Sequence, residues 1–347
     1  MPDRVIAFAP GRVNLIGECT DYNDGLALPF TIDRGVTVTA EPLAGGEVIA
    51  VAEAYGEEDR FAVGDPPRGG GGWRAFVHGV AGELGAAGHR LAGARLTIGG
   101  DLPVGAGLSS SAALSVAVAL GLLAAAGADA GDRLALARLC SRVENEWVGA
   151  RTGLLDQLAV LFGAREQALR IDFRTLDVRD VPLALGDWRL VTVDSGERRD
   201  LAGSGYNERR AECERAAAAL GVASLRDART DELGRLPDVL ARRARHVIEE
   251  NERVKEAATA LAAGDLERLA GLLDAAHASL RDLFEVSTPA VEATVARCRA
   301  AGAAGARLMG GGFGGQVLAL MAPGASPPAD AHEVRPGPGA RVGQADP

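Results

Sequence analysis

Residues 103–112 read PVGAGLSSSA, and this Gly/Ser-rich stretch decides how the first half of the chain folds. It follows residues 94–98, which are typical of a strand, and it opens the Ala-rich residues 112–126, which are typical of a buried helix. Glycines let the backbone approach a ligand closely, and a helix start points free N–H groups at an anion. The stretch therefore predicts a phosphate-binding turn, although a plain turn with a serine N-cap has the same local sequence.

The rest of the chain shows how this loop must hold a phosphate. Lys255 is the only lysine, and it lies in a charged helical segment far from any Gly-rich loop. Walker-type nucleotide sites need a lysine beside the phosphates, so this sequence excludes that class. Backbone N–H groups, arginine and a metal ion are left to carry the phosphate charge.

Strand and helix patterns flank the loop on both sides. Strands are expected at residues 5–9, where a Pro10-Gly11 turn ends the strand, at 31–41 and at 47–52. The second half restarts with strands and continues with long helices, and its Pro- and Gly-rich tail from residue 323 onward is expected to be mobile. A length of 347 residues suggests two domains, and we expect them to span residues 1–170 and 171–347.

The charge and the cysteine content of the chain limit the kinds of partner and compartment that we expect. The formal net charge is −10, which disfavours nucleic acid and anionic membranes, so neither is expected as a partner. The apolar residues 112–126 are short for a membrane span. Four widely spaced cysteines without a C-x-x-C pair indicate a reducing compartment, and no signal peptide is visible. We expect a cytoplasmic monomer that binds a small molecule.

Two further Gly-rich stretches carry chemistry. Residues 9–29 (APGRVNLIGECTDYNDGLALP) place carboxylates and an arginine among glycines directly after a strand, a mixture that suits several sugar hydroxyls. A solvated turn is the alternative for this stretch. Residues 310–315 contain five glycines in six positions, which fits either a loop crowded against a ligand or a long hairpin turn.

Together these stretches resemble the signature motifs of the GHMP small-molecule kinases. The first is similar to the family's phosphate loop, P-x-G-x-G-L-x-S-S-A, and GRVNLIGECTDYN at residues 11–23 is similar to the galactokinase signature. Further matches are GLLDQ at 153–157, GYNERRAEC at 205–213 and EVSTP at 285–289. The resemblance implies an α/β N-terminal domain of the ribosomal-S5-domain-2-like type and a ferredoxin-like α+β C-terminal domain.

The resemblance also implies ATP and Mg²⁺ as cofactors. Ser111 and Glu144 match the serine and glutamate that hold the metal in the family. Without a phosphate-site lysine, the metal must neutralise most of the phosphate charge. The nucleotide is expected along the loop, at Gly105, Ala106, Gly107, Leu108, Ser109, Ser110 and Ser111.

Asp156 matches the catalytic aspartate of the family and Arg12 matches its partner. The implied reaction moves the terminal phosphate of ATP onto the C1 hydroxyl of galactose. Asp156 would take the proton of that hydroxyl, and Arg12 would keep the carboxylate ionised. A helix cap is the simpler alternative for Asp156. Arg12 and Asp156 must meet near the start of the serine-led helix for this hypothesis to hold.

The sugar residues follow from the same resemblance. Asp21 matches a carboxylate that grips O3 and O4, and Glu18 matches a residue near O6. Tyr206 matches a tyrosine that contacts the sugar, with a core aromatic as the alternative, and Gly153 belongs to a matching motif. Cys19 stands where the signature has a histidine that helps hold the C6 hydroxyl, and a thiol is a poor substitute.

Three activities therefore stay open. Galactose 1-phosphorylation fits the motifs, whereas the loss of a C6 contact at Cys19 fits a kinase for L-arabinose or another aldose. A sugar sensor that has lost phosphoryl transfer is a third reading. Arg12, Asp156, Ser111 and Glu144 are all present, which argues for an enzyme. The Pro-rich residues 322–331 are too short for the helix that the family has there.

Overall fold

The computed structural model describes residues 4–102, 107–150, 152–197 and 204–344. The chain divides into two compact units, and each unit is assembled from separate segments. The first unit consists of Met1–Arg12, Thr31–Arg165 and Gly337–Pro347, and the second consists of Val13–Phe30 and Glu166–Pro336. The main break, at 165/166, lies five residues before the boundary that we expected at 170/171. The sequence did not indicate that Val13–Phe30 belongs to the second unit or that Gly337–Pro347 belongs to the first.

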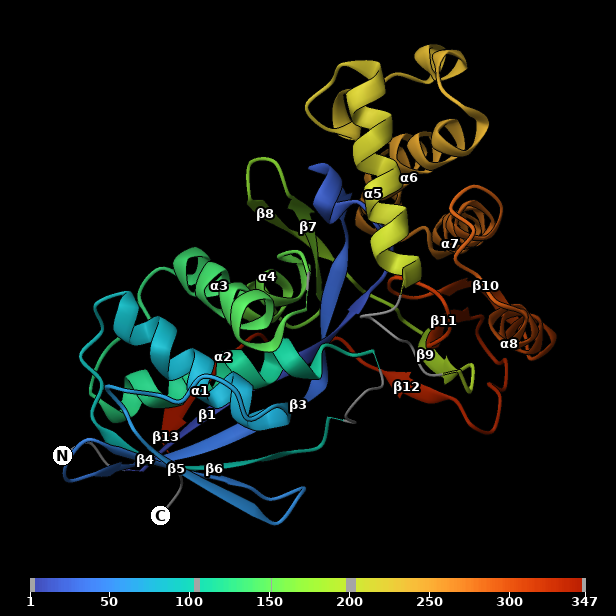
Figure 1. Cartoon of the computed structure of the whole chain (residues 1–347). Helices are drawn as coiled ribbons and strands as arrows, with labels where there is room; N and C mark the ends of the chain where they lie inside the picture. Colours follow the sequence, from blue (N-terminus) through green and yellow to red (C-terminus); the bar gives the residue numbers. More distant parts are fainter. Residues whose placement is uncertain (1–3, 103–106, 151, 198–203, 345–347) are drawn as a thin grey trace. The chain divides into compact units, whose positions relative to one another are not determined.

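Within the described residues, the first unit is built on a six-stranded sheet of order β13-β1-β3-β6-β4-β5 (Figure 1). Strand β4 runs parallel to β6, whereas β3–β6, β4–β5 and β1–β13 are antiparallel pairs. The strands are β1 (Val5–Asn14), β3 (Pro29–Leu43), β4 (Glu47–Ala52), β5 (Glu57–Ala62), β6 (Gly93–Gly100) and β13 (Arg341–Gln344).

Helices cover one face of this sheet (Figure 1). Helix α2 (Ser110–Ala125) is apolar on every side and deeply buried, as its Ala-rich sequence predicts. At Gly121, an added Cβ would lie 3.1 Å from Val38 of β3, so this glycine lets helix and sheet approach closely. The other helices of the unit are α1 (Gly72–Ala86), α3 (Arg133–Arg142), the π-helical turn η2 (Val143–Val148) and α4 (Leu155–Phe162).

The expected turn at Pro10-Gly11 is wrong. Strand β1 runs through both residues to Asn14. Gly11 is required there because an added Cβ would lie 2.6 Å from Leu102 and 2.9 Å from the carbonyl of Leu108. The glycine therefore serves a close tertiary approach rather than a reversal of the chain.

The second unit contains two sheets within the described residues. The first has the order β10-β11-β9-β12, with antiparallel pairs throughout, and the second has the order β2-β7-β8. The strands of the first are β9 (Arg189–Asp194), β10 (Ala303–Leu308), β11 (Gln316–Met321) and β12 (His332–Val334). Those of the second are β2 (Leu26–Ala27), β7 (Gln167–Asp172) and β8 (Asp177–Pro182).

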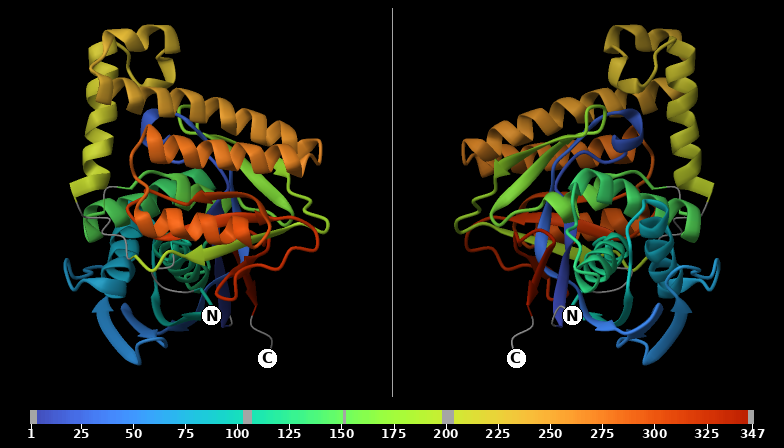
Figure 2. Two further views of the ribbon diagram at one scale, coloured as in Figure 1. Left: turned by 90° about the vertical axis from the view of Figure 1, so that its right-hand side faces the viewer. Right: turned by 90° about the vertical axis from the view of Figure 1, so that its left-hand side faces the viewer.

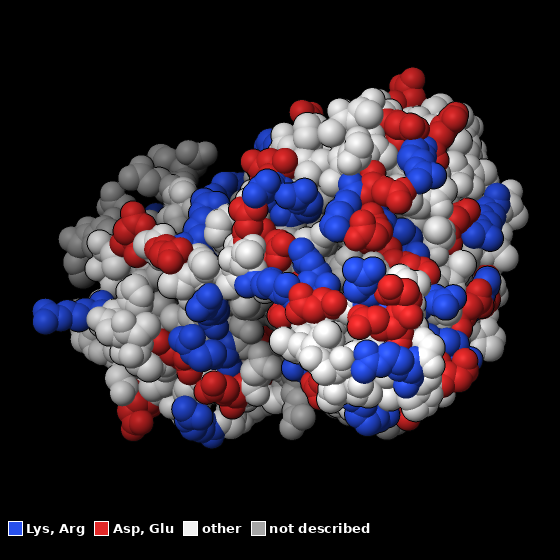
Figure 3. Space-filling view, turned by 90° about the horizontal axis from the view of Figure 1, so that it is seen from above, with Lys and Arg blue, Asp and Glu red and all other residues white. Residues whose placement is uncertain are grey.

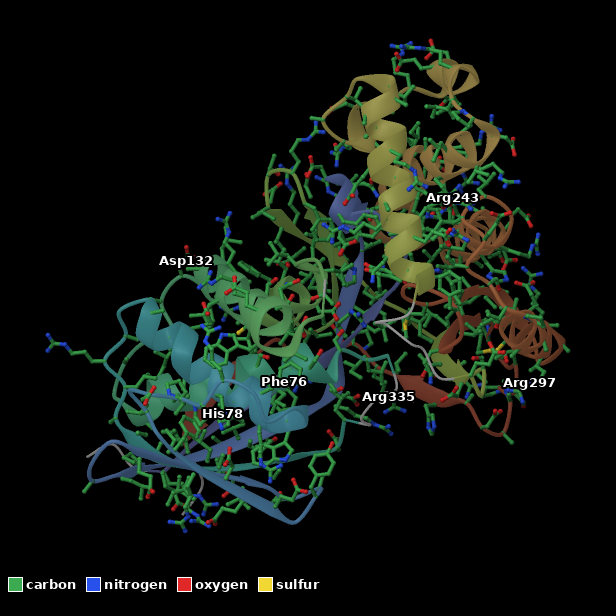
Figure 4. The ribbon with its side chains drawn as sticks, viewed as in Figure 1. Phe76, His78, Asp132, Arg243, Arg297 and Arg335 are labelled. Atoms are coloured by element: carbon green, nitrogen blue, oxygen red, sulfur yellow. The ribbon has the colours of Figure 1, made fainter. Side chains whose placement is uncertain are left out.

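Long helices pack on these sheets, and Figure 2 shows α6 and α7 running side by side. Thr288 caps α8 and is followed by Pro289 at the first helical position, where proline is favoured. Arg243 of α6 (Figure 4) is almost fully buried and donates to Glu212 of α5 at 2.7 Å. The helices are α5 (Ser204–Leu220), α6 (Asp238–Ala262), α7 (Leu266–Asp282) and α8 (Pro289–Ala300), with short turns η1 (Asp21–Asn23), η3 (Leu225–Asp227) and η4 (Thr230–Arg235).

The C-terminal tail is ordered, so the expectation of mobility is wrong for its described part. Residues 322–331 form no helix, as expected, but β12 then pairs with β9 and β13 pairs with β1. Gly337 allows this return, because an added Cβ would lie 2.2 Å from the carbonyl oxygen of Ile32. Strand pairing therefore orders a segment whose composition alone predicts mobility.

Charged side chains on the visible face of the molecule are mixed in sign (Figure 3). Many arginines pair with acidic residues, as Arg174 does with Asp227 at 2.8 Å and Arg297 with Asp330 at 2.8 Å. Such exposed pairs contribute little stability each. Among the described residues, no helix is long and apolar enough to cross a membrane.

Candidate active site

Arg12 and Asp156 form an ion pair in the first unit. The Arg12 Nε donates to Asp156 Oδ1 at 2.8 Å, and Nη2 lies 2.6 Å from the same oxygen. Arg12 comes from β1, and Asp156 lies in the first turn of α4. The N-cap of α4 is Leu154 and no side chain caps it, so Asp156 is not a helix cap. The two residues therefore meet, although 144 positions separate them in sequence.

The same pair is tied to the Gly/Ser loop. Arg12 Nη1 donates to the Gly107 carbonyl at 2.9 Å, and its backbone N–H donates to the Leu108 carbonyl at 3.1 Å. Ser109 Oγ donates to Asp156 Oδ2 at 2.5 Å. Each oxygen of Asp156 thus accepts a hydrogen bond, one from Arg12 and one from Ser109. Ser109 is the N-cap of α2, and Arg12 contacts the loop that precedes this helix. The aspartate is held in one orientation, which is a requirement for directed proton transfer.

Ser109 has an unusual backbone. It is the N-cap of α2, with φ 60° and ψ 44°, and its side chain makes no capping bond. A left-handed conformation is unfavourable for a residue with a Cβ, and such strain clusters at functional sites. The hydroxyl is turned to Asp156 instead of the helix amides, so those amides keep their free N–H groups for an anion.

Glu144 is a buried carboxylate beside this cluster. It lies in η2, and one of its oxygens accepts from Thr152 at 2.7 Å. The other oxygen, Oε1, is buried and has no hydrogen-bond partner among the described residues. Burial raises the pKa of Glu144 and the charge of Asp156 raises it further, while hydrogen bonding to Ser111 opposes both. A divalent cation would relieve this arrangement, so Glu144 and Ser111 fit a magnesium site.

The donor set also indicates which metal fits. Among the described residues, no cluster of at least three His, Cys, Asp or Glu side chains could hold a metal ion. Mg²⁺ commonly takes only one or two protein carboxylates and completes its shell with phosphate oxygens and water. One carboxylate and one hydroxyl therefore suit Mg²⁺ better than a metal that needs a full protein cage.

The structure describes only some of the other residues that are expected to bind the nucleotide. Gly105 and Ala106 lie outside the described residues. Gly107 has φ +69°, in the region that favours glycine, and Ser110 opens α2. Gly153 lies between Thr152 and the start of α4, three positions before Asp156. Gly107, Ser110 and Gly153 belong to the same unit as the Arg12–Asp156 pair.

In the second unit, Glu18 is bound from two sides. Its Oε1 lies 2.7 Å from Arg307 Nη2 and accepts from the backbone N–H of Gly310 at 2.7 Å. Both side chains are buried. Burial raises the pKa of Glu18, but the charge of Arg307 and the Gly310 amide outweigh it and the net pKa is lowered. Glu18 therefore joins the signature stretch to the Gly-rich loop at residues 310–315, a contact that the sequence did not indicate.

Aromatic residues connect the same stretch to α5. The rings of Tyr22 and Tyr206 meet edge to face, with centroids 5.9 Å apart. An added Cβ at Gly311 would lie 2.8 Å from the Tyr206 ring, so this glycine is needed for the ring to pack. Asp21 begins the short turn η1, one residue before Tyr22. Tyr206, Asp21 and the Gly-rich loop are thus gathered in the second unit.

Cys19 does not present a polar group in place of the missing histidine. Its side chain belongs to the hydrophobic core cluster of the second unit, together with Val191, Val193 and Cys213. Burial raises its pKa well above the ordinary value, and the charge of Glu18 adds to the effect. All four cysteines are free and buried. The thiol is therefore a neutral group within the core of the second unit.

Comparisons with known proteins agree with this architecture. Family models match a galactokinase galactose-binding signature at residues 1–42, a GHMP kinase N-terminal domain at 75–164 and a GHMP kinase C-terminal domain at 257–336. A mevalonate kinase shares the fold, with a TM-score of 0.68 and 19% identity over 91% of each chain. The fold and the site define a two-domain GHMP kinase.

Similar proteins narrow the class further. A galactokinase of Mycobacterium tuberculosis is 48% identical over 90% of this chain and 88% of its own length. A galactokinase of Thermotoga neapolitana is 40% identical over 91% and 89%. The structure of Lactococcus lactis galactokinase in complex with galactose matches with a TM-score of 0.88 and 33% identity, covering 97% of this chain and 95% of that one. The chain belongs to the galactokinase family.

Proposed function

We propose that this protein transfers the terminal phosphate of ATP to the C1 hydroxyl of α-D-galactose, giving galactose 1-phosphate and ADP. Membership of the galactokinase family supports the substrate pair. The single observation that carries the chemistry is the Arg12–Asp156–Ser109 cluster at the start of α2. It places an oriented carboxylate next to a helix start that can bind phosphate.

In this proposal, the C1 oxygen attacks the terminal phosphorus, the bond to the leaving ADP oxygen breaks, and the proton of the C1 hydroxyl passes to Asp156. Arg12 holds Asp156 in place through their ion pair and would put its positive charge beside the charge that develops on the phosphate. Ser109 holds the second carboxylate oxygen, so its bond must open or shift when the sugar hydroxyl arrives. A loose transition state needs mainly such positioning and charge.

The nucleotide is assigned to the loop at residues 105–111 and its metal to Ser111 and Glu144. Backbone amides at the start of α2 would bind phosphate oxygens, because no lysine is present in this loop. Mg²⁺, when bound, would supply the positive charge that neutralises the β- and γ-phosphates. The orphaned Oε1 of Glu144 supports this assignment.

The sugar is assigned to Asp21, Glu18, Gly153 and Tyr206. Asp21 would accept hydrogen bonds from adjacent hydroxyls, and Tyr206 would pack against the ring. Because Glu18 Oε1 already serves Arg307 and Gly310, we assign its effect on the sugar largely to the shape of the loop. We also infer that the protein acts in the cytoplasm as a monomer, which size-exclusion chromatography with light scattering would test.

The decisive experiment measures ADP release with galactose, ATP and Mg²⁺, with Asp156→Ala as the matched control. Intact protein is expected to turn over and to form galactose 1-phosphate, detected by ³¹P NMR. The Asp156→Ala variant is expected to keep sugar binding and lose turnover. If the intact protein binds galactose but releases no ADP, the enzyme proposal fails and a sensor is favoured.

A second acceptor is favoured by one specific observation. Cys19 is buried in the core and offers no polar replacement for the signature histidine. A pocket that lacks a contact to the C6 hydroxyl discriminates less against a sugar without that group. L-Arabinopyranose, which has the galactose ring configuration without CH₂OH, is therefore the alternative acceptor. A sugar panel at fixed ATP decides, and arabinose turnover well above galactose turnover would reverse the order.

A further inference from the structure

One face of α6 bonds to the backbone of the sugar signature. We call residues 17–26 the sugar loop. Glu250 Oε1 accepts from the N–H of Gly17 at 2.9 Å, and Asn251 Oδ1 accepts from the N–H of Leu26 at 2.8 Å. His246 Nε2 lies 3.2 Å from the carbonyl of Glu18. His246 and Glu250 are four residues apart and share a helix face, and Asn251 directly follows Glu250, so α6 contacts both ends of the sugar loop.

These side chains are buried, and their surroundings set their protonation states. Glu250 and His246 are fully buried and Asn251 nearly so. Burial raises the pKa of Glu250, but Arg253, whose Nε lies 2.7 Å from Oε2, together with His246 and Arg307 lowers it overall. Burial lowers the pKa of His246 to about 4. At neutral pH, Glu250 is an anion and His246 is neutral, and its Nε2 must carry the proton to bond a carbonyl.

The sugar loop needs this external support. Its backbone takes positive φ at Gly17 (+100°) and at Cys19 (63°) and Asp24 (53°), where side chains disfavour it. An added Cβ at Gly25 would lie 2.7 Å from Asn251 Oδ1, so the loop is pressed onto the helix. Polar groups buried against α6 cost free energy unless they are bonded, and the loop supplies those bonds.

We propose that His246, Glu250 and Asn251 are positioning residues that set the affinity for the sugar by fixing the sugar loop. This inference rests on the proposed function, because it takes Asp21 in the middle of the loop as a sugar ligand. His246, Glu250 and Asn251 bond to the loop backbone at Glu18, Gly17 and Leu26. Their effect on the reaction is therefore transmitted through the loop.

The kinetic signature follows from a population argument. If a bond is removed, the loop samples other conformations, and the apparent sugar affinity falls by the fraction of molecules that keep the binding geometry. Saturating sugar restores that geometry, so kcat changes little. The phosphate loop belongs to the other unit, so KM for ATP is expected to stay constant.

The test compares Asn251→Ala with Glu252→Ala in the full chain. Glu252 is the next residue of α6, is exposed and pairs with Lys255 at 2.7 Å, so it controls for helix propensity and purification. We expect Asn251→Ala to raise KM for galactose about 10-fold, the effect of one lost buried bond. kcat and KM for ATP should change less than about twofold, and Glu252→Ala should resemble the intact protein.

Two further variants, one at Asn251 and one in the sugar loop, and a hydrogen-exchange measurement complete the test. Asn251→Asp retains an oxygen for the Leu26 N–H, so most of the galactose affinity should return. Gly25→Ala leaves the side chains of α6 unchanged but crowds the loop against Asn251 and against Thr20 of the loop itself, and it should raise KM for galactose as Asn251→Ala does. Hydrogen exchange should show faster exchange in a peptide covering residues 17–26, with unchanged protection in α2.

The outcomes separate this inference from the proposed function. If the intact protein phosphorylates no sugar, the proposed function fails, and the exchange experiment still tests whether α6 orders the loop. If the intact protein is active and Asn251→Ala leaves KM for galactose unchanged, the positioning inference is overturned. Equal losses for galactose and ATP would overturn it too, because they indicate general destabilisation. If Asn251→Ala does not fold, the same criteria apply to Gly25→Ala.

Discussion

The catalytic cluster and the sugar loop are built in opposite ways. In the cluster, Arg12, Asp156 and Ser109 bond to each other through their side chains, and Asp156 keeps 26% of its side chain exposed. The sugar loop, by contrast, is held through its backbone, which bonds to buried side chains of α6 such as Glu250. The chemistry of the first is carried by residues in recognisable motifs. The conformation of the second depends on α6 residues that belong to no motif, so only the tertiary structure reveals which residues hold the loop.

The largest expected effect breaks the cluster. Asp156→Asn keeps the shape but removes the base and the partner of Arg12. We expect kcat to fall by about 10³-fold, within the range for general-base loss, while KM for galactose changes little. Steady-state ADP release with purified protein measures it. Retention of more than about a tenth of kcat would mean that Asp156 is not the base.

The next effect concerns the support of the sugar loop. Arg307→Leu leaves Glu18 as a buried carboxylate without its cationic partner, and it also frees the carbonyls of Asn14 and Leu15. Breaking a buried pair in this way costs about 3–5 kcal/mol of unfolding free energy. Urea unfolding followed by circular dichroism measures the loss. An unchanged midpoint would show that the pair is replaceable.

The same ion pair predicts a pH dependence. The folded pKa of Glu18 is below its ordinary value of 4.5, so the pair contributes stability above that value and loses it as the pH falls through the folded pKa. The intact protein should therefore lose stability on acidification below about pH 4.5, and Arg307→Leu should lose less over the same range. Melting temperatures between pH 3 and 7 compare the slopes. Parallel slopes would contradict the assignment.

Ser109→Ala tests how far orientation of the base matters. It removes one of the bonds to Asp156 and leaves Arg12 in place. We expect kcat to fall about 10-fold, since one hydrogen bond to a charged group contributes about 1.5 kcal/mol. Steady-state rates at saturating ATP and galactose measure the change. An increase in kcat would mean that Ser109 must be displaced for Asp156 to act.

The smallest effect separates function from stability at Glu144. Its raised pKa means that the carboxylate destabilises the fold above that pKa and that the penalty vanishes below its ordinary value of 4.5. Glu144→Gln should therefore have a higher free energy of unfolding than the intact protein at pH 8 in the absence of metal, with no gain at pH 4. The same variant should need more Mg²⁺ for half-maximal activity. A loss of stability at pH 8 would contradict this reading.

Much of the local structure could be predicted from the sequence. The strand at 47–52 coincides with β4, and the apolar helix after the Gly/Ser loop is α2. Their patterns are periodic and local, so they are informative without tertiary context. Strand β5, with its charged residues Glu57, Glu58, Asp59 and Arg60, was missed. It is an edge strand of the sheet, where alternation of apolar residues is weak.

The remaining errors share a cause. The tail beyond residue 323 reads as mobile, but pairing of β13 with β1 orders its end. Similarly, α3 ends at Arg142 and a π-helical turn begins at Val143, and that turn carries Glu144. Its C-cap, Gly149, has φ +85°, which local sequence alone does not place. Partners far along the chain decide these features, and no local pattern encodes a distant partner.

The sequence by itself determined the kind of chemistry. A lysine-free Gly/Ser loop, a carboxylate-rich signature and the GLLDQ motif around Asp156 predict a phosphate site, a sugar site and a base. Tertiary structure alone decided that Ser109 holds Asp156, that Arg307 neutralises Glu18 and that α6 supports the sugar loop. Motifs record which groups react. The orientation of those groups depends on buried bonds between distant segments, whose formation requires the packed core.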